Sequence, residues 1–174
     1  DDHESIDRST TLKDIDDLAL REARLEQARE NYLKVLPIFT DIQENLGLAN
    51  TLKALGNLAS IQGETGRAVD MLQRSLDIDT EIQNMLGVRA DHGYLGQHFM
   101  RNDQPREAAL AFEASLQALS KQADPIGYQI AFQGQLDAFA KLNDIICFLA
   151  CLTVLAVLDE GLEERYTVLP NSLQ

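Results

Sequence analysis

The chain is 174 residues long, with 45% hydrophobic and 25% charged residues, which is the composition of an ordinary globular domain. Its formal net charge of −13 excludes a generally basic surface, so we expect neither nucleic acid nor an anionic membrane as a partner. The longest apolar run, residues 145–158, is shorter than the roughly 20 residues that a membrane-spanning helix needs.

The first part of the chain predicts an acidic tail over residues 1–8, followed by a helical repeat domain over residues 9–160. Residues 12–36 contain no Gly or Pro and show no obvious turn, so they form either one continuous helix or two helices joined by a tight turn. Pro37 follows directly. Because proline lacks the backbone N–H and clashes with the preceding turn, we expect it to kink this helix or end it early.

The chain then repeats with a period of 40 residues. Glycines and alanines fall in register at Gly47, Gly87 and Gly127, at Gly56 and Gly96, and at Ala28, Ala68 and Ala108. A large side chain stands four residues after each of these alanines, at Tyr32, Leu72 and Phe112. Within a period the apolar residues recur at helical spacing. The sequence therefore predicts about four antiparallel helix pairs, over residues 9–47, 48–87, 88–127 and 128–160.

Turn signals divide each period into two helices. The clusters GETG at 63–66, NDQP at 102–105 and ND at 143–144 predict the turn between the first and second helix of a pair. The glycines that precede the next pair, of which Gly47 is the first, are interpreted as left-handed residues that end the second helix.

Gly56 lies in the middle of a predicted helix, where glycine costs about 1 kcal/mol relative to alanine. Its recurrence at Gly96 favours a packing role, in which the missing side chain lets neighbouring helices approach closely. In the last pair Leu136 takes the place of this glycine and Phe148 takes the place of the small alanine. We therefore expect the close packing to be lost in that pair.

The apolar run 145–158 predicts a helix that is buried on both sides. Either residues 161–174 fold back over it as a C-terminal cap, or a second surface covers it, which would make the chain a homodimer through this segment. Cys147 and Cys151 lie within the run, four residues apart on one helical face, where they are poorly oriented to form a disulfide. Two free buried thiols favour a reducing, cytoplasmic setting.

Two short motifs carry a resemblance to a known family. LGNLA at 55–59 and LGQHF at 95–99 follow a Leu-Gly-x2-aromatic pattern, with Ala in the aromatic position of the first. An Ala-x3-Phe pattern follows at three places: ARENY at 28–32, AVDML at 68–72 and AALAF at 108–112. These motifs resemble those of the tetratricopeptide repeat family. The 40-residue period is similar to the subclass found in kinesin light chains and Pins-type adaptors. The resemblance implies an all-α, right-handed α-solenoid of antiparallel helix pairs.

In this family the first helix of each pair lines a concave groove, so the resemblance implies a module that binds a protein or peptide segment there. It places eight residues in the groove: Asn50, Lys53, Asn57, Tyr94, Gln97, Arg101, Gln133 and Asp137. Lys13 and Asp17 are their counterparts in the first pair. Lys53 and Asn57 lie four residues apart and could together hold a carboxylate of the partner. The alternative is a polar face that is merely solvated.

Other functions find less support in the sequence. A sensor or assembly portion of a larger regulator is one alternative, motivated by a chain that does not begin with Met. A metal-dependent enzyme is another, using the acidic cluster DIDD at 14–17, although such a run is usually a solvated helix face. No nucleotide-binding or nucleophile motif is present, so we expect no enzyme activity and no cofactor. His92 and His98 align with apolar core positions, which predicts structural roles for both.

Overall fold

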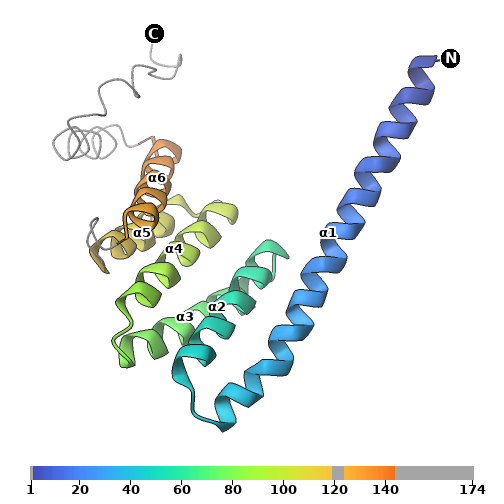
Figure 1. Cartoon of the computed structure of the whole chain (residues 1–174). Helices are drawn as coiled ribbons and strands as arrows, with labels where there is room; N and C mark the ends of the chain where they lie inside the picture. Colours follow the sequence, from blue (N-terminus) through green and yellow to red (C-terminus); the bar gives the residue numbers. More distant parts are fainter. Residues whose placement is uncertain (1, 119–123, 144–174) are drawn as a thin grey trace. The chain divides into compact units, whose positions relative to one another are not determined.

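The computed structural model describes residues 2–118 and 124–143, with side chains from residue 19 onward. These residues form six helices and no strand: α1 (Asp2–Asp41), α2 (Asn45–Ile61), α3 (Thr65–Glu81), α4 (Met85–Arg101), α5 (Pro105–Ala118) and α6 (Pro125–Lys141) (Figure 1). The predicted all-α fold of tetratricopeptide-like helix pairs is confirmed. The chain divides into two compact units, residues 1–91 and 92–174.

The four described turns between helices share one geometry. A residue with positive φ stands in each of them, at Gln43, Gly63, Gln83 and Asp103, and another, Asn143, follows α6. In the first turn the N–H of Gln43 donates to the carbonyl of Thr40 at 3.2 Å, and the N–H of Glu44 donates to the carbonyl of Phe39 at 3.0 Å. These two bonds satisfy carbonyls that a helix end leaves free. The first four of these residues are spaced 20 residues apart, and the turns predicted near 63–66, 102–105 and 143–144 are confirmed.

The glycines at 47, 87 and 127 have a different role from the predicted one. Each lies in the first turn of the helix that follows, and the left-handed residue stands four positions earlier where the turn is described, at Gln43 and Gln83. Their backbone N–H groups are capped by side chains of Glu44, Asn84 and Asp124 respectively. A Cβ at Gly87 would collide with the carboxylate of Asp79. At Gly47 an added Cβ would likewise collide with the side chains of Glu44 and Phe39. Gly47 and Gly87 therefore require glycine for close approach and not for a left-handed backbone.

Helix α1 is one continuous helix, so the two-helix alternative for residues 12–36 is wrong. It runs through Pro37 to Asp41, and the expected early end at Pro37 is wrong as well. Ala23 stands 40 residues before the left-handed Gly63, and alanine favours the continued helix over a turn. Because α1 begins at Asp2, no helix end coincides with the predicted boundary between residues 8 and 9.

The first unit packs α1 against α2 and α2 against α3. Leu52, Leu55 and Leu72 are among its buried apolar residues. A Cβ at Gly56 would come within 2.8 Å of Cγ of Leu72, closer than two such carbons can approach. The packing role predicted for Gly56 therefore has a direct geometric basis, because α3 places Leu72 against the bare backbone of α2.

The second unit packs α5 against α6 around Phe112, which is 2% exposed. The ring of Phe112 lies against Gly96 of α4, where a Cβ would come within 2.7 Å of it. A Cβ at Gly134 of α6 would also collide with this ring. The packing of the last predicted pair, Phe148 included, lies outside the described residues. Leu136 of α6 aligns with Gly56 and Gly96 of the earlier pairs. Gly134, two residues before it, nevertheless lets α6 pack closely against Phe112 of α5.

The apolar run 145–158, its two cysteines and the predicted cap 161–174 also lie outside the described residues. Among the helices that the structure does describe, a long apolar segment capable of crossing a membrane is not found.

Candidate functional site

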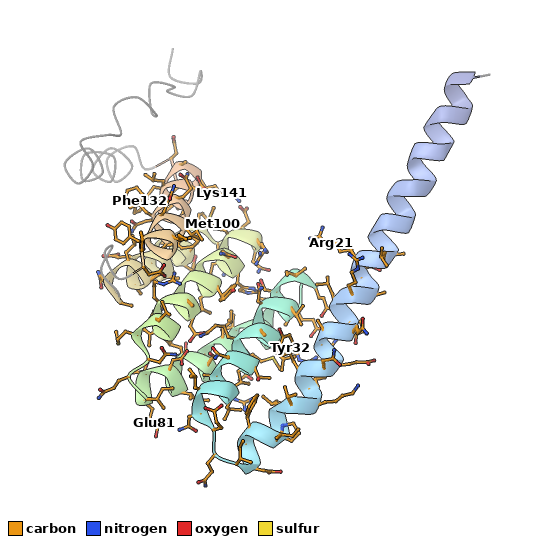
Figure 2. The ribbon with its side chains drawn as sticks, viewed as in Figure 1. Arg21, Tyr32, Glu81, Met100, Phe132 and Lys141 are labelled. Carbon is orange, nitrogen blue, oxygen red and sulfur yellow. The ribbon has the colours of Figure 1, made fainter. Side chains whose placement is uncertain are left out.

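A hollow of about 500 Å³ opens in the second unit, beside α4 and α6 and over Phe112 of α5. We call it the α4–α6 hollow, and nine residues line it: Gln97, Met100, Arg101, Phe112, Gln129, Ile130, Gln133, Gly134 and Asp137. Figure 2 shows the side chains of this unit, with Met100 labelled on α4. The two glycines that receive the Phe112 ring set the distance of α4 and α6 from α5, so the core packing fixes the shape of the hollow.

The lining combines an apolar part with amide and charged groups. Half-buried Met100 supplies apolar surface, Ile130 adds a side chain that is 52% exposed, and the buried ring of Phe112 forms the floor. Among the polar groups, Nε2 of Gln133 donates to Oδ1 of Asp137 at 2.9 Å, which orders both side chains on the exposed face of α6. Such a surface offers hydrogen-bond donors and acceptors beside an apolar contact, as binding pockets in proteins do.

The structure brings together four of the eight residues predicted for the groove: Gln97, Arg101, Gln133 and Asp137. Tyr94 is half-buried on α4 and is not among the lining residues. The prediction of groove residues missed the other five lining residues: Met100, Phe112, Gln129, Ile130 and Gly134. The signal for Gln129 was present, because Gln129, Gln133 and Asp137 recur every four residues and so share one face of α6.

The other three predicted residues lie on α2 in the first unit. Asn50 is exposed and Asn57 is half-buried, whereas Lys53 is only 8% exposed. Nζ of Lys53 lies 2.8 Å from Oδ2 of Asp79 and 3.6 Å from Oδ1 of Asp91. Its charge is therefore engaged by carboxylates of the chain itself. A clamp of Lys53 and Asn57 on a partner's carboxylate stays a prediction, and this internal ion pair argues against it.

Asp79 and Asp91 are both fully buried beside Lys53. Asp79 accepts hydrogen bonds from Lys53 and, at 2.8 Å, from Nδ2 of Asn84. Within the described part of the chain, neither carboxylate oxygen of Asp91 has a hydrogen-bond partner. The pKa of Asp91 is raised to about 7, mainly by burial; the neighbouring Asp79 adds to this rise, and the Lys53 ammonium opposes it. The interior of the first unit thus contains two carboxyl groups and one ammonium group.

Sequence reasoning did not single out this cluster. Its signal was an acidic residue, Asp79, in the same helical stripe as Ala68 and Leu72. A charged group on a buried stripe needs a partner of opposite charge, because an unpaired charge is rarely fully buried. The partners lie 26 residues earlier and 12 residues later, and only the fold brings them together.

Comparison with known proteins bears on part of this architecture. Residues 16–81 match the tetratricopeptide repeat family. Tetratricopeptide repeats generally mediate interactions between proteins. No curated protein matches the chain.

The matched residues take in most of α1, all of α2 and all of α3. They include Gly56 and Leu72, whose contact joins α2 to α3. This contact pairs the glycine of one tetratricopeptide repeat motif with the large residue of the other.

The two histidines assigned structural roles are partly or wholly inside the protein. His98 is fully buried, and its ring lies edge-to-face with Phe99 at a centroid distance of 5.8 Å. Burial lowers the pKa of His98, as does the nearby charge of Arg101, and burial also lowers the pKa of half-buried His92. The structural role predicted for His98 agrees with its position.

The metal-enzyme alternative depends on the acidic cluster at 14–17, which lies on α1 among the residues whose side chains the structure leaves undescribed. In the described part of the molecule, no group of three or more His, Cys, Asp or Glu residues could hold a metal ion.

Proposed function

We propose that the chain is a protein-interaction module that binds an extended or helical segment of a partner in the α4–α6 hollow. The observation that carries this proposal is the convergence of four predicted groove residues, from two helices, on one hollow. Tyr94 of α4 is proposed as a further contact. The α2 residues Asn50 and Asn57 are proposed as a separate contact surface on the first unit. The general role of tetratricopeptide repeats in protein interactions supports the assignment.

The chemistry of the hollow favours a peptide with an apolar side chain. Ile130 and Met100 offer the surface against which such a side chain would pack, and the hydrophobic gain is roughly 25 cal/mol per Å² buried. The glutamine amides can both donate to and accept from a peptide backbone. Arg101 and Asp137 provide one charge of each sign, so the hollow itself does not select a strongly charged partner.

A displayed library of random peptides tests this function. Peptides selected on the intact chain should bind at least about tenfold more weakly to Ile130→Glu, because the new carboxylate would have to be desolvated against the apolar surface. Ile126→Glu is the matched control, since Ile126 is on the same helix, is 73% exposed and does not line the hollow. Equal binding to both variants and to the unchanged chain would contradict the proposed site.

We propose further that the chain is a cytoplasmic adaptor of the kinesin light chain and Pins type, a subclass suggested by the 40-residue period alone. Residues 145–158 are proposed to contact a second copy of the chain, because a helix that is apolar on both sides must be covered on both. A strictly monomeric chain in sedimentation at micromolar concentration would contradict that contact.

A further inference from the structure

Four large apolar side chains are exposed at one end of the first unit. Ile42 in the α1–α2 turn is 62% exposed, and Leu46 in the first turn of α2 is 46% exposed. Met85 and Leu86 in the first turn of α4 are 45% and 54% exposed. We call these four residues the helix-end surface. Leu46 and Leu86 are equivalent in the 40-residue repeat, so the same position is both apolar and exposed twice within the unit.

Contacts inside the unit bring the parts of this surface together. Oγ of Ser75 donates to the carbonyl of Ala49 at 2.9 Å, which sets the C-terminal end of α3 beside the start of α2. Oδ1 of Asp91 lies 3.6 Å from Nζ of Lys53, which sets the start of α4 beside α2 as well. The α1–α2 and α3–α4 turns accordingly lie at the same end of the unit (Figure 1). Neighbouring exposed apolar residues that form a patch mark a binding surface, whereas single ones are common on any protein.

The charged residues that border the helix-end surface are acidic. The sequence has no Lys or Arg over residues 35–52 or over residues 75–88. Asp41 is exposed at the last position of α1, and Glu81 is exposed at the equivalent position of α3, where Figure 2 labels it. The unit thus presents apolar side chains beside negative charges at this end.

The two acidic residues do not stabilise the helices that carry them. The C-terminal end of a helix has a partial negative charge, so a carboxylate in the last turn is unfavourable and a cation is favourable there. Neither α1 nor α3 has a basic residue in its last turn. Lys34 and Arg74 precede Asp41 and Glu81 by seven residues, about 10 Å along a helix. Among the described residues, neither carboxylate has an ion-pair partner.

We propose that the helix-end surface binds a basic amphipathic helix of another protein. The apolar face of such a helix would pack on Ile42, Leu46 and Leu86, and its Lys or Arg side chains would neutralise Asp41 and Glu81. This site lies in the first unit and goes beyond the function proposed for the α4–α6 hollow.

The charge of the surface selects this occupant over the alternatives. A second copy of the chain is disfavoured, because its formal net charge of −13 would be repelled by the same acidic residues. An anionic membrane is disfavoured for the same reason. The apolar run 145–158 contains no Lys or Arg, so it could cover the apolar side chains but would leave the carboxylates without a counter-charge.

A displayed library of helical peptides tests the chemistry of the partner. Each peptide has Leu at i, i+3, i+4 and i+7, with Lys, Gln or Glu allowed at every flanking position. Peptides selected on the unchanged chain should be enriched in Lys. They should bind about tenfold more weakly to Glu81→Lys than to Asp70→Lys, because only the first change places a cation at the contact. Asp70 is the matched control, since it is exposed on the same helix and its replacement changes the net charge equally.

Leu86→Ser tests the apolar part of the surface. It should weaken binding of the selected peptides by about fivefold, because it removes one aliphatic contact. Leu110→Ser is the control, since Leu110 is 64% exposed on α5 and does not line the α4–α6 hollow. Both variants should keep the melting temperature of the unchanged chain, because both side chains are already exposed.

Three results would overturn the proposal. The first is a selection without enrichment of Lys, or equal binding to the two members of either matched pair. The second is a melting temperature lowered by Leu86→Ser, or a dimer that this variant dissociates, since the chain's own residues or a second copy would then cover the surface. The third is binding of the selected peptides that is weakened by Ile130→Ser and not by Leu86→Ser. In that case the peptides occupy the α4–α6 hollow, and the function proposed for the hollow stands without the helix-end surface.

Discussion

The interiors of the two units share one type of helix contact but differ in the residues that surround it. In both, a glycine of one helix receives a large side chain of the next, Gly56 with Leu72 and Gly96 with Phe112. Beside the first contact the protein buries an ionic cluster around Lys53, whereas the second is surrounded by apolar residues such as Ala131 and Ala108. One period after Lys53 stands Gly93, and one period after Asp91 stands Ala131.

This comparison separates what the repeat requires from what this chain adds. The glycine contact recurs because the helix spacing depends on it. Lys53 and Asp91 are replaced by Gly93 and Ala131 one period later, so the helix spacing does not depend on these two charges. Buried ion pairs contribute little net stability, although removing one partner is costly. Substitutions at the two kinds of contact should therefore differ in the size of their effects.

The largest effect should come from Lys53→Met. This change removes the ammonium group that faces Asp79 and Asp91, and leaves Asp79 buried without its counter-charge. Losing one partner of a buried pair costs about 3–5 kcal/mol, so the free energy of unfolding in urea should fall by that order. Lys34→Met on the exposed surface of α1 is the control and should leave unfolding nearly unchanged. Equal stability of the two variants would mean that Lys53 is available to a ligand, as the carboxylate clamp requires.

The next effect is a dependence of stability on pH that originates at Asp91. Its pKa is about 7 in the folded protein and 3.8 without the protein's influence, so the folded state binds the additional proton between these values. The contribution of Asp91 to stability is therefore fully present below pH 3.8 and is lost as the pH rises to about 7. At about 1.4 kcal/mol per pKa unit, the change amounts to a few kcal/mol.

Asp91→Asn isolates this contribution, because the amide keeps the shape of the side chain and does not titrate. The difference in unfolding free energy between the unchanged chain and the variant should fall from acidic to neutral pH and then stay constant. A difference that rises with pH over this range would show that Asp91 is stabilised as a carboxylate by Lys53, and would reverse the assignment.

The repeat itself could be predicted from the sequence because it depends on local signals. The spacing of small and large residues at 28, 68 and 108 and four residues later identified the helix pairs, and GETG and NDQP located turns. The role of Gly87 could not be predicted in this way. Glycine is favoured both at left-handed positions and at close contacts, and only the position of Asp79 distinguishes the two.

The candidate site was predictable only in part, again from local signals. The inward face of the repeated helices predicts four lining residues: Gln97, Arg101, Gln133 and Asp137. The burial of Lys53 does not, because it depends on partners from α3 and α4 that no local pattern connects. The continuity of α1 likewise depends on a weak local preference at Ala23, where the sequence left both one helix and two open.

The smallest expected effect on the free energy of unfolding comes from replacing each of two glycines, Gly66 and Gly56, by alanine. Alanine is favoured over glycine in a helix by about 1 kcal/mol, so a glycine without a packing role should be improved by it. In the described part of the chain, a Cβ at Gly66 would meet nothing within 4 Å beyond its own helix backbone, and Gly66→Ala should stabilise the protein by up to that amount. At Gly56 the same Cβ would lie 2.8 Å from Cγ and 3.2 Å from the backbone N of Leu72.

Overpacking costs typically about 1–3 kcal/mol, so Gly56→Ala should lower the free energy of unfolding despite the better helix propensity. The two substitutions should therefore have opposite signs in urea unfolding. If both stabilised the protein, helix propensity would outweigh the contact, and Gly56 would not be what sets the spacing of α2 and α3.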